Sequence, residues 1–343
     1  MKKIILVCLI FTVLGCNGRD DTSNHFTIEK FPLTKEINLE ILNEIHDVIP
    51  SQIIVLDSQL VQVNKSGDQY FWIIDKSSKN VIKRFGEKQG PLELFEPVVL
   101  QQYFEETDTV YHILYEVGKR RVSFVDLKNG NLEKFDRIEL PDDIHDTFRF
   151  VYYSDSLSIT VPTGMEEAGR FKILKNDELK HIKYLPVLPF KVHENNLNPI
   201  YTNVSSSYNL EKGVFVATSN LLGQYDFFDF SGEYLYSTII DRDENLKKAI
   251  QPELIFNESI TFYNTRIISD DSYIYSMYTI MNREKGSSFS KLHVLGWNGK
   301  PVKEYTFDQV VSAFDYDRKN NCFYGITYSN DSSERFYLVK WII

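Results

Sequence analysis

Histidines are the side chains best suited to metal binding or proton transfer, but their spacing here indicates neither. They stand singly, without an HExxH, HxH or Cys/His zinc pattern. Isolated histidines of this kind are usually surface or core residues. The sequence therefore predicts no metal site and no cofactor. The seven are His25, His46, His112, His145, His181, His193 and His293.

The acidic run 241–245, Asp-Arg-Asp-Glu-Asn, resembles the first ligands of a calcium loop. Leu246 stands where that loop needs Gly, and Pro252 stands where it needs Glu, so the EF-hand pattern fails. An acidic helix N-terminus is the better interpretation, with a nonstandard divalent-cation site as the alternative.

Nucleophilic motifs are equally weak. Ser288 and Lys291 match SxxK, and 65–67 resembles a KTG element, but their order is reversed and the SxxK precedes an expected strand. No G-x-S-x-G elbow, P-loop or dinucleotide fingerprint occurs. Catalytic groups drawn from distant loops leave no linear motif, so an enzyme is not excluded, although a non-enzymatic protein is favoured.

Two further groups fall in expected loops. Paired acids would make a carboxylate dyad only if folding joined two loops, and solvated turns are the simpler interpretation. Loop aromatics would stack on sugars or peptides if they met at one surface. The acid pairs are Glu105-Glu106, Asp142-Asp143, Glu166-Glu167 and Asp270-Asp271, and the aromatics are Tyr103, Phe104, Tyr201, Tyr208 and Tyr263.

The composition indicates a globular, strand-rich chain. Of 343 residues, 43% are hydrophobic and 25% charged, which supports a large core. Aromatic residues make up 14%, and these are enriched in strands. The formal charge of −10 argues against a nucleic-acid partner, which would need a concentrated basic surface.

The N-terminus reads as an export signal. Lys2 and Lys3 precede an apolar run, 4–14, which is too short to span a bilayer as a mature helix. Gly15-Cys16 at its end resembles a bacterial lipobox, which implies cleavage before Cys16 and lipid attachment to its thiol. A plain secretory signal is the alternative. We expect residues 1–15 to be the signal peptide and 16–24 a flexible tether.

The remaining features of this segment fit the same location. Cys8 would leave with the signal, so Cys322 would be the single thiol of the folded body, buried and inert. The tether residues 19–21, Arg-Asp-Asp, resemble the acidic surface-export signal of Bacteroidetes lipoproteins. We expect an outer-membrane lipoprotein on the cell surface or the periplasmic face.

An internal repeat organises the body. A strand, an Asx or Gly turn and a charged strand recur at intervals near 50 residues, the period of a four-stranded β-propeller blade. The turns Asn129-Gly130, Ser231-Gly232 and Asn298-Gly299 suit positive φ. The copies span 70–85, 122–135, 171–185, 225–239 and 291–307.

Residues 25–343 are therefore predicted to form an all-β, six-bladed propeller. We expect the first strand, 26–31, to pair with the C-terminal strand, 336–343, and so close the ring. A β-sandwich or two smaller β domains are the alternatives. Residues 36–48 and 243–256 look helical, the second as an insertion over one mouth of the ring. Most aromatics should act as wedges between blades.

Two stretches carry a family resemblance. Residues 85–93, FGEKQGPLE, and 291–328, which include Gly296-Trp297-Asn298-Gly299, resemble the TolB-like six-bladed propeller lipoproteins of Bacteroidetes. Leu92 stands where a second Gly is commoner. The resemblance implies the fold and lipoprotein status, and the family brings no settled activity.

Three functions follow as hypotheses. The first is a non-enzymatic binding platform in the envelope for a protein, peptide or glycan, attached to the membrane by its lipid. The second is a hydrolase or lyase acting on a carbohydrate or peptide, which requires clustered acids or histidines at one channel mouth. The third is a structural subunit, which requires a broad apolar patch. A binder should show exposed aromatics at the mouth without a perturbed acid–base pair.

Overall fold

The computed structural model describes residues 25–88, 97–106, 109–116, 121–130, 138–139, 147–154, 157–162, 171–175, 178–182, 193, 204–219, 221–241, 259–282, 287–329 and 335–343. Within this part of the chain the regular elements are all β-strands, and no helix occurs. The all-β prediction is confirmed. The signal peptide and the tether, 1–24, lie outside the described residues.

Hydrogen bonding divides these strands into six sheets. Three sheets consist of four consecutive strands each: β4 (Pro50–Val55), β5 (Gln59–Asn64), β6 (Gln69–Asp75) and β7 (Val81–Glu87); β8 (Pro97–Glu106), β9 (Thr109–Glu116), β10 (Arg121–Val125) and β11 (Ile138–Glu139); β12 (Thr147–Ser154), β13 (Leu157–Pro162), β14 (Phe171–Lys175) and β15 (Glu178–Ile182).

The other three sheets each add one strand from the N-terminal segment, β1 (His25–Thr27), β2 (Thr34–Ile37) or β3 (Glu40–Ile45). Their consecutive strands are β16 (Val204–Asn209), β17 (Val214–Ser219), β18 (Gly223–Asp229) and β19 (Tyr234–Asp241); β20 (Ser259–Ser269), β21 (Tyr273–Asn282), β22 (Ser287–Gly296) and β23 (Pro301–Phe307); β24 (Val311–Asp317), β25 (Cys322–Tyr328) and β26 (Phe336–Ile342).

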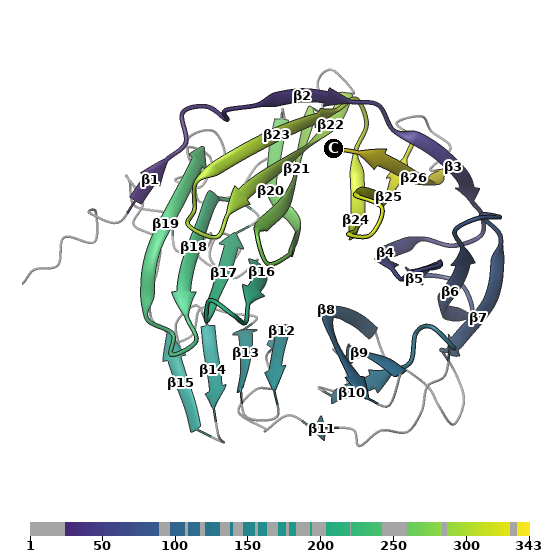
Figure 1. Cartoon of the computed structure of the whole chain (residues 1–343), viewed down its shortest axis with the longest axis horizontal. Helices are drawn as coiled ribbons and strands as arrows, with labels where there is room; N and C mark the ends of the chain where they lie inside the picture. The colour runs from purple at the N-terminus through teal and green to yellow at the C-terminus, as the bar shows by residue number, and fades with distance from the viewer. Residues whose placement is uncertain are drawn as a thin grey trace, which may run out of the picture.

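The sheets lie around one centre in a β-propeller arrangement (Figure 1). The first strand of each sheet lies innermost, and β8, β12, β16, β20, β24 and β4 contact one another in that order. Between β4 and β8, Gln52 Nε2 donates to Val99 O at 3.0 Å, and Val99 N donates to Gln52 Oε1 at 2.9 Å. The ends of these inner strands therefore meet at the two mouths of one central channel.

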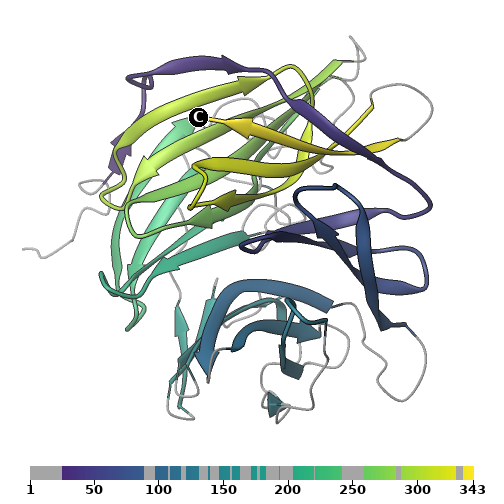
Figure 2. The ribbon, with the colours of Figure 1, turned by 45° about the vertical axis from the view of Figure 1, so that its right-hand side comes forward.

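The N-terminal strands run along the outer rim across three sheets (Figures 1 and 2). β1 pairs in parallel with β19, β2 pairs in parallel with β23, and β3 pairs antiparallel with β26. Because β3 pairs with β26, the first and last parts of the sequence share one sheet, and the chain then continues into β4 of the next sheet. This pairing closes the ring and covers the edge of the C-terminal strand.

Closure was expected from residues 26–31, and that detail is wrong. Residues 25–27 pair with β19, and the partner of the C-terminal strand is β3. The helix expected over 36–48 is also wrong, because these residues form β2 and β3. The edges of β23 and β26 supply hydrogen-bond partners that outweigh the local helical periodicity. The helix expected over 243–256 lies outside the described residues.

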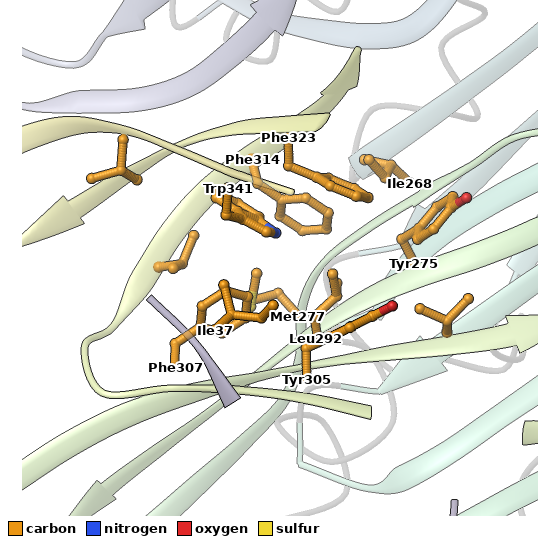
Figure 3. Close-up of a cluster of buried hydrophobic side chains, with 13 residues drawn as sticks. Ile37, Ile268, Tyr275, Met277, Leu292, Tyr305, Phe307, Phe314, Phe323 and Trp341 are labelled. Carbon is orange, nitrogen blue, oxygen red and sulfur yellow. The ribbon is translucent and has the colours of Figure 1, made fainter. Parts of the chain in front are cut away.

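Large aromatic side chains fill the spaces between sheets, as the sequence predicts. The bulkiest side chains that are almost fully buried among the described residues are all Tyr or Phe. In Figure 3, Phe314, Phe323 and Trp341 of the last sheet face Tyr305 and Phe307 of its neighbour. The rings of Phe323 and Trp341 stack with centroids 5.4 Å apart. The aromatic excess is therefore largely structural.

The repeated Asx-Gly and Ser-Gly turns also join the sheets. Gly130, Gly232 and Gly299 have positive φ values of 65°, 85° and 75°. Each lies close to β7, β15 or β19 of the preceding sheet, where a Cβ would strike a side chain. Lys83 Nζ of β7 donates to Asn129 O at 2.5 Å, and Lys180 Nζ of β15 donates to Ser231 O at 2.7 Å. Glycine is required both for the turn and for the close approach.

We predict that Gly232→Ala destabilises the protein more than Gly213→Ala. Both positions have positive φ, 85° and 62°. A Cβ at 232 would lie 2.6 Å from Ile182 Cδ1, whereas a Cβ at 213 would have no neighbour within 4 Å. Backbone strain should cost about 1 kcal/mol at 213, and strain with overpacking about 3 kcal/mol at 232. Urea unfolding measures both values, and equal losses would contradict the packing role of the turn.

Candidate functional site

A cavity of about 720 Å³ opens at one mouth of the channel. Four stretches that line it complete or follow inner strands: 54–59, 207–211, 266–271 and 315–319. Val99 of β8 and His112 of β9 add a further sheet. Side chains from five sheets therefore meet in one hollow, the usual form of a small-molecule site.

Arg266 of β20 lines the cavity and is held by the protein around it. It lies directly after an irregularity in the β20–β21 pairing, a feature that redirects side chains near sites. Its Nε donates to Phe314 O at 3.0 Å, which holds the guanidinium against β24. Burial lowers the pKa of Arg266, and the charge of Asp315 opposes that shift. The group keeps its charge because the ordinary pKa of arginine is so high.

Asp315 of β24 is the acid that interacts with Arg266. Its Oδ2 accepts from Val55 N at 2.8 Å, and its Oδ1 accepts from Tyr316 N at 2.9 Å. Burial raises the pKa of Asp315, and these hydrogen bonds and Arg266 oppose the rise. The bond to Val55 joins the last sheet to the first, so the position of this carboxylate depends on the closed ring.

His112 of β9 lines the same cavity and is almost fully buried. Burial lowers its pKa to about 4, against the opposing charge of Asp126. The imidazole is therefore neutral at pH 7. It offers the cavity a neutral hydrogen-bonding group and adds no positive charge.

Two of the lining carboxylates are already committed to structure. Asp317 forms a buried ion pair with Lys76 Nζ at 2.6 Å, which again joins the first and last sheets. Asp270 accepts from Ser272 N at 2.8 Å, Tyr273 N at 2.7 Å and Tyr275 Oη at 2.8 Å, and so shapes its own turn. Both acids position the loops rather than face a ligand.

Exposed charged side chains surround the outer part of the cavity. Asp57, Lys128, Glu211, Arg318 and Lys319 line it with both signs mixed. Tyr208 and Tyr316 add partly buried aromatic rings. The exposed part of the lining is thus polar and of mixed charge, and two aromatic groups also line the cavity.

The structure brings together some of the residues that the sequence indicated. Asp270-Asp271, Tyr208 and His112 all line the cavity. His293 does not: it is buried between the rings of Phe31 and Tyr278, with Nε2 3.0 Å from Glu304 Oε2. The other histidines, His25, His46, His181 and His193, lie outside the cavity lining, and His145 is not described.

Other predicted groups fall elsewhere. Ser288 to Lys291 lie within β22, where Ser290 is buried and accepts from Val311 N at 3.0 Å, so the SxxK match is not a catalytic motif. Cys322 is a buried free thiol, as expected. The segments or side chains of the remaining candidates lie outside the described residues; these are Cys16, Tyr103, Phe104, Glu105-Glu106, Asp142-Asp143, Glu166-Glu167, Tyr201, residues 242–245 and Tyr263.

Arg266 and Asp315 were not identified from the sequence. Asp315 stands in the stretch that carries the family resemblance. The alternation of aromatic and acidic residues in that stretch indicates only a strand. Arg266 stands in an apolar strand, where a lone Arg is the single available signal. Their meeting depends on contact between β20 and β24, which no local motif encodes.

Within the described residues, no group of three or more His, Cys, Asp or Glu side chains is arranged to hold a metal. No helix there is long and apolar enough to cross a membrane.

Two solved structures share this fold. A member of the DUF4221 family from Bacteroides vulgatus is 13% identical, with a TM-score of 0.53 over 90% of this chain and 98% of that one. A protein from Bacteroides fragilis that is named as exported is 10% identical, with a TM-score of 0.53 over 92% and 98% of the two chains. No protein-family model and no curated protein matches the sequence. At these identities the likeness concerns the fold alone.

We predict that Lys76→Met lowers stability by about 3 kcal/mol at pH 7, because it leaves the buried Asp317 carboxylate without its partner. Lys180→Met is the matched control, since its pair with Glu233 is exposed and should contribute less than about 1 kcal/mol. Urea unfolding of the two variants measures the difference.

The effect should depend on pH. Burial acts to raise the pKa of Asp317, but the hydrogen bonds from Lys76 and Asn320 outweigh burial and lower this pKa. The ionised Asp317 carboxylate stabilises the folded protein above the ordinary aspartate pKa of about 4. This stabilisation is lost as the pH falls through the lowered pKa of Asp317. The difference in unfolding free energy between the wild type and Lys76→Met should therefore decrease below about pH 4. A difference in unfolding free energy that stays constant down to pH 3 would contradict a stabilising ion pair between Lys76 and Asp317.

Proposed function

We propose that this protein is a cell-envelope binding protein that takes a small polar ligand into the cavity at the mouth of its propeller. The observation that carries the proposal is that Arg266 and Asp315, whose charges interact, both line one cavity of about 720 Å³, within the size range of ligand sites. Inner strands hold these groups rigidly, which reduces the ordering cost of binding.

The cellular setting is part of the same proposal. The protein would be an outer-membrane lipoprotein, acylated at Cys16, with residues 16–24 as tether and 25–343 as a propeller in which each of the six sheets counts as one blade. The six hydrogen-bonded sheets and the lipobox resemblance support kinship with the TolB-like lipoproteins. The exported Bacteroides fragilis protein of the same fold supports an envelope location. A larger envelope protein, peptide or glycan would be the source of the ligand.

A hydrolase or lyase is the second candidate, favoured by the acids that gather at this mouth. Against it, Asp270 and Asp317 are bound within their own turns or to Lys76, and Asp315 accepts two backbone N–H groups. These bonds commit the carboxylates to holding the turns and the closed ring in place. The partly buried rings of Tyr208 and Tyr316 in the same lining are suited to stacking on a ligand.

The binding site can be tested by blocking the mouth. Ser58 lies exposed at the cavity, and Ser231 lies exposed on an outer turn. We predict that Ser58→Cys, once labelled with a bulky maleimide, loses the thermal shift caused by any small polar ligand found in a screen. Labelled Ser231→Cys should keep it. Loss in both variants, or in neither, would contradict binding at the cavity.

Lipid attachment has an equally direct test. Cells grown with a palmitate analogue should label the wild-type protein and Cys322→Ala, and they should not label Cys16→Ala. Cys322 is the matched control because it is a buried free thiol. Label that persists on Cys16→Ala would refute acylation at this position.

A further inference from the structure

Arg266 presents an unusual donor set to the cavity. Its Nε is engaged by Phe314 O, which fixes the plane of the guanidinium. The structure gives the two terminal nitrogens no hydrogen-bond or ion-pair partner among the described residues. These nitrogens form the paired edge that binds a carboxylate or phosphate with two parallel hydrogen bonds. The first requirement on a ligand is therefore a planar or tetrahedral oxyanion.

Asp315 sets the second requirement. It lines the same cavity and its charge interacts with that of Arg266, so this carboxylate would repel a purely anionic ligand. A dianionic phosphate would suffer this most. Each oxygen of Asp315 accepts one backbone N–H and retains a second lone pair, so the carboxylate still has capacity for a ligand donor. A positive or hydrogen-bond-donating group beside the oxyanion satisfies both residues.

The remaining groups restrict the overall charge of the ligand. His112 is neutral at pH 7 and adds no cation to the cavity. The described lining contains six carboxylates and four fixed cations, so it does not favour a net anion. A ligand with one carboxylate and one ammonium matches this balance and brings no net charge into a partly buried site.

We propose that the cavity binds a small zwitterion of the α-amino acid class, with its carboxylate on Arg266 and its ammonium on Asp315. This rests on the proposed binding function and names the ligand class. The α-carbon holds the two charges side by side, as Arg266 and Asp315 are held by neighbouring strands. The volume of the cavity leaves room for the amino acid side chain towards Tyr208 and Tyr316.

The test is isothermal titration calorimetry and thermal shift on the whole chain carrying Cys16→Ser, with the twenty standard L-amino acids as probes. For each binder, its amide lacks the carboxylate and its N-acetyl form lacks the ammonium. We expect binding of the amino acid and at least a tenfold loss for each derivative. A matched dipeptide, whose charges are farther apart, should also bind more weakly.

Two variants assign the contacts. Arg266→Lys retains the charge but removes the paired donors, and it should weaken binding about tenfold or more. Lys300→Gln, which removes an exposed cation outside the cavity lining, should change affinity less than twofold. The derivatives are tested on the unmutated site, so the result does not depend on whether Arg266→Lys folds.

Failure of the inference and of the proposed function are distinguishable. If no amino acid binds, or if amide and parent bind equally, the zwitterion assignment is overturned. If a sugar or another ligand without a carboxylate then binds and the labelled Ser58→Cys blocks it, the binding function stands. If labelling at Ser58 blocks no ligand, the binding function fails as well.

Discussion

The pairing of β3 with β26 is the contact on which the cavity depends. It joins residues 40–45 to residues 336–340 and places the start and end of the chain in one sheet. The cavity is then completed from both sides of this junction, because Val55 donates to Asp315 and Lys76 pairs with Asp317. A ring opened here would lose the partners that position both carboxylates. The cavity is thus a product of ring closure rather than of any one sheet.

Packing between sheets keeps the rest of the ring in register. Each glycine turn packs against the sheet before it, and aromatic side chains fill the wider spaces. Because this scaffold supports the ends of the inner strands, the turns at the mouth carry chemistry without having to form their own core. Arg266 and Asp315 lie at such strand ends, where two neighbouring sheets meet.

Local patterns predicted the hairpins well, because turn chemistry and strand alternation are encoded within a few residues. The turns at Gly130, Gly232 and Gly299 are examples, and their positive φ values follow from the residue type. The N-terminal segment failed for the opposite reason. Residues 40–45 have a helical periodicity on their own, and only the distant edge of β26 makes them a strand. Likewise, Asp270 and Tyr208 were recognised as candidates from the sequence, whereas the position of Arg266 in the cavity lining follows from its contact with β24.

Native-state hydrogen exchange at increasing urea concentrations tests the dependence of the site on ring closure most directly. The backbone amides of β3 and β26 and those of residues 54–55 and 315–317 should open together, with one common free energy and urea dependence. Such a result would show that the cavity persists only while the ring is closed. Exchange of β3 at a distinctly lower free energy, with the amides of Val55 and Tyr316 still protected, would contradict it.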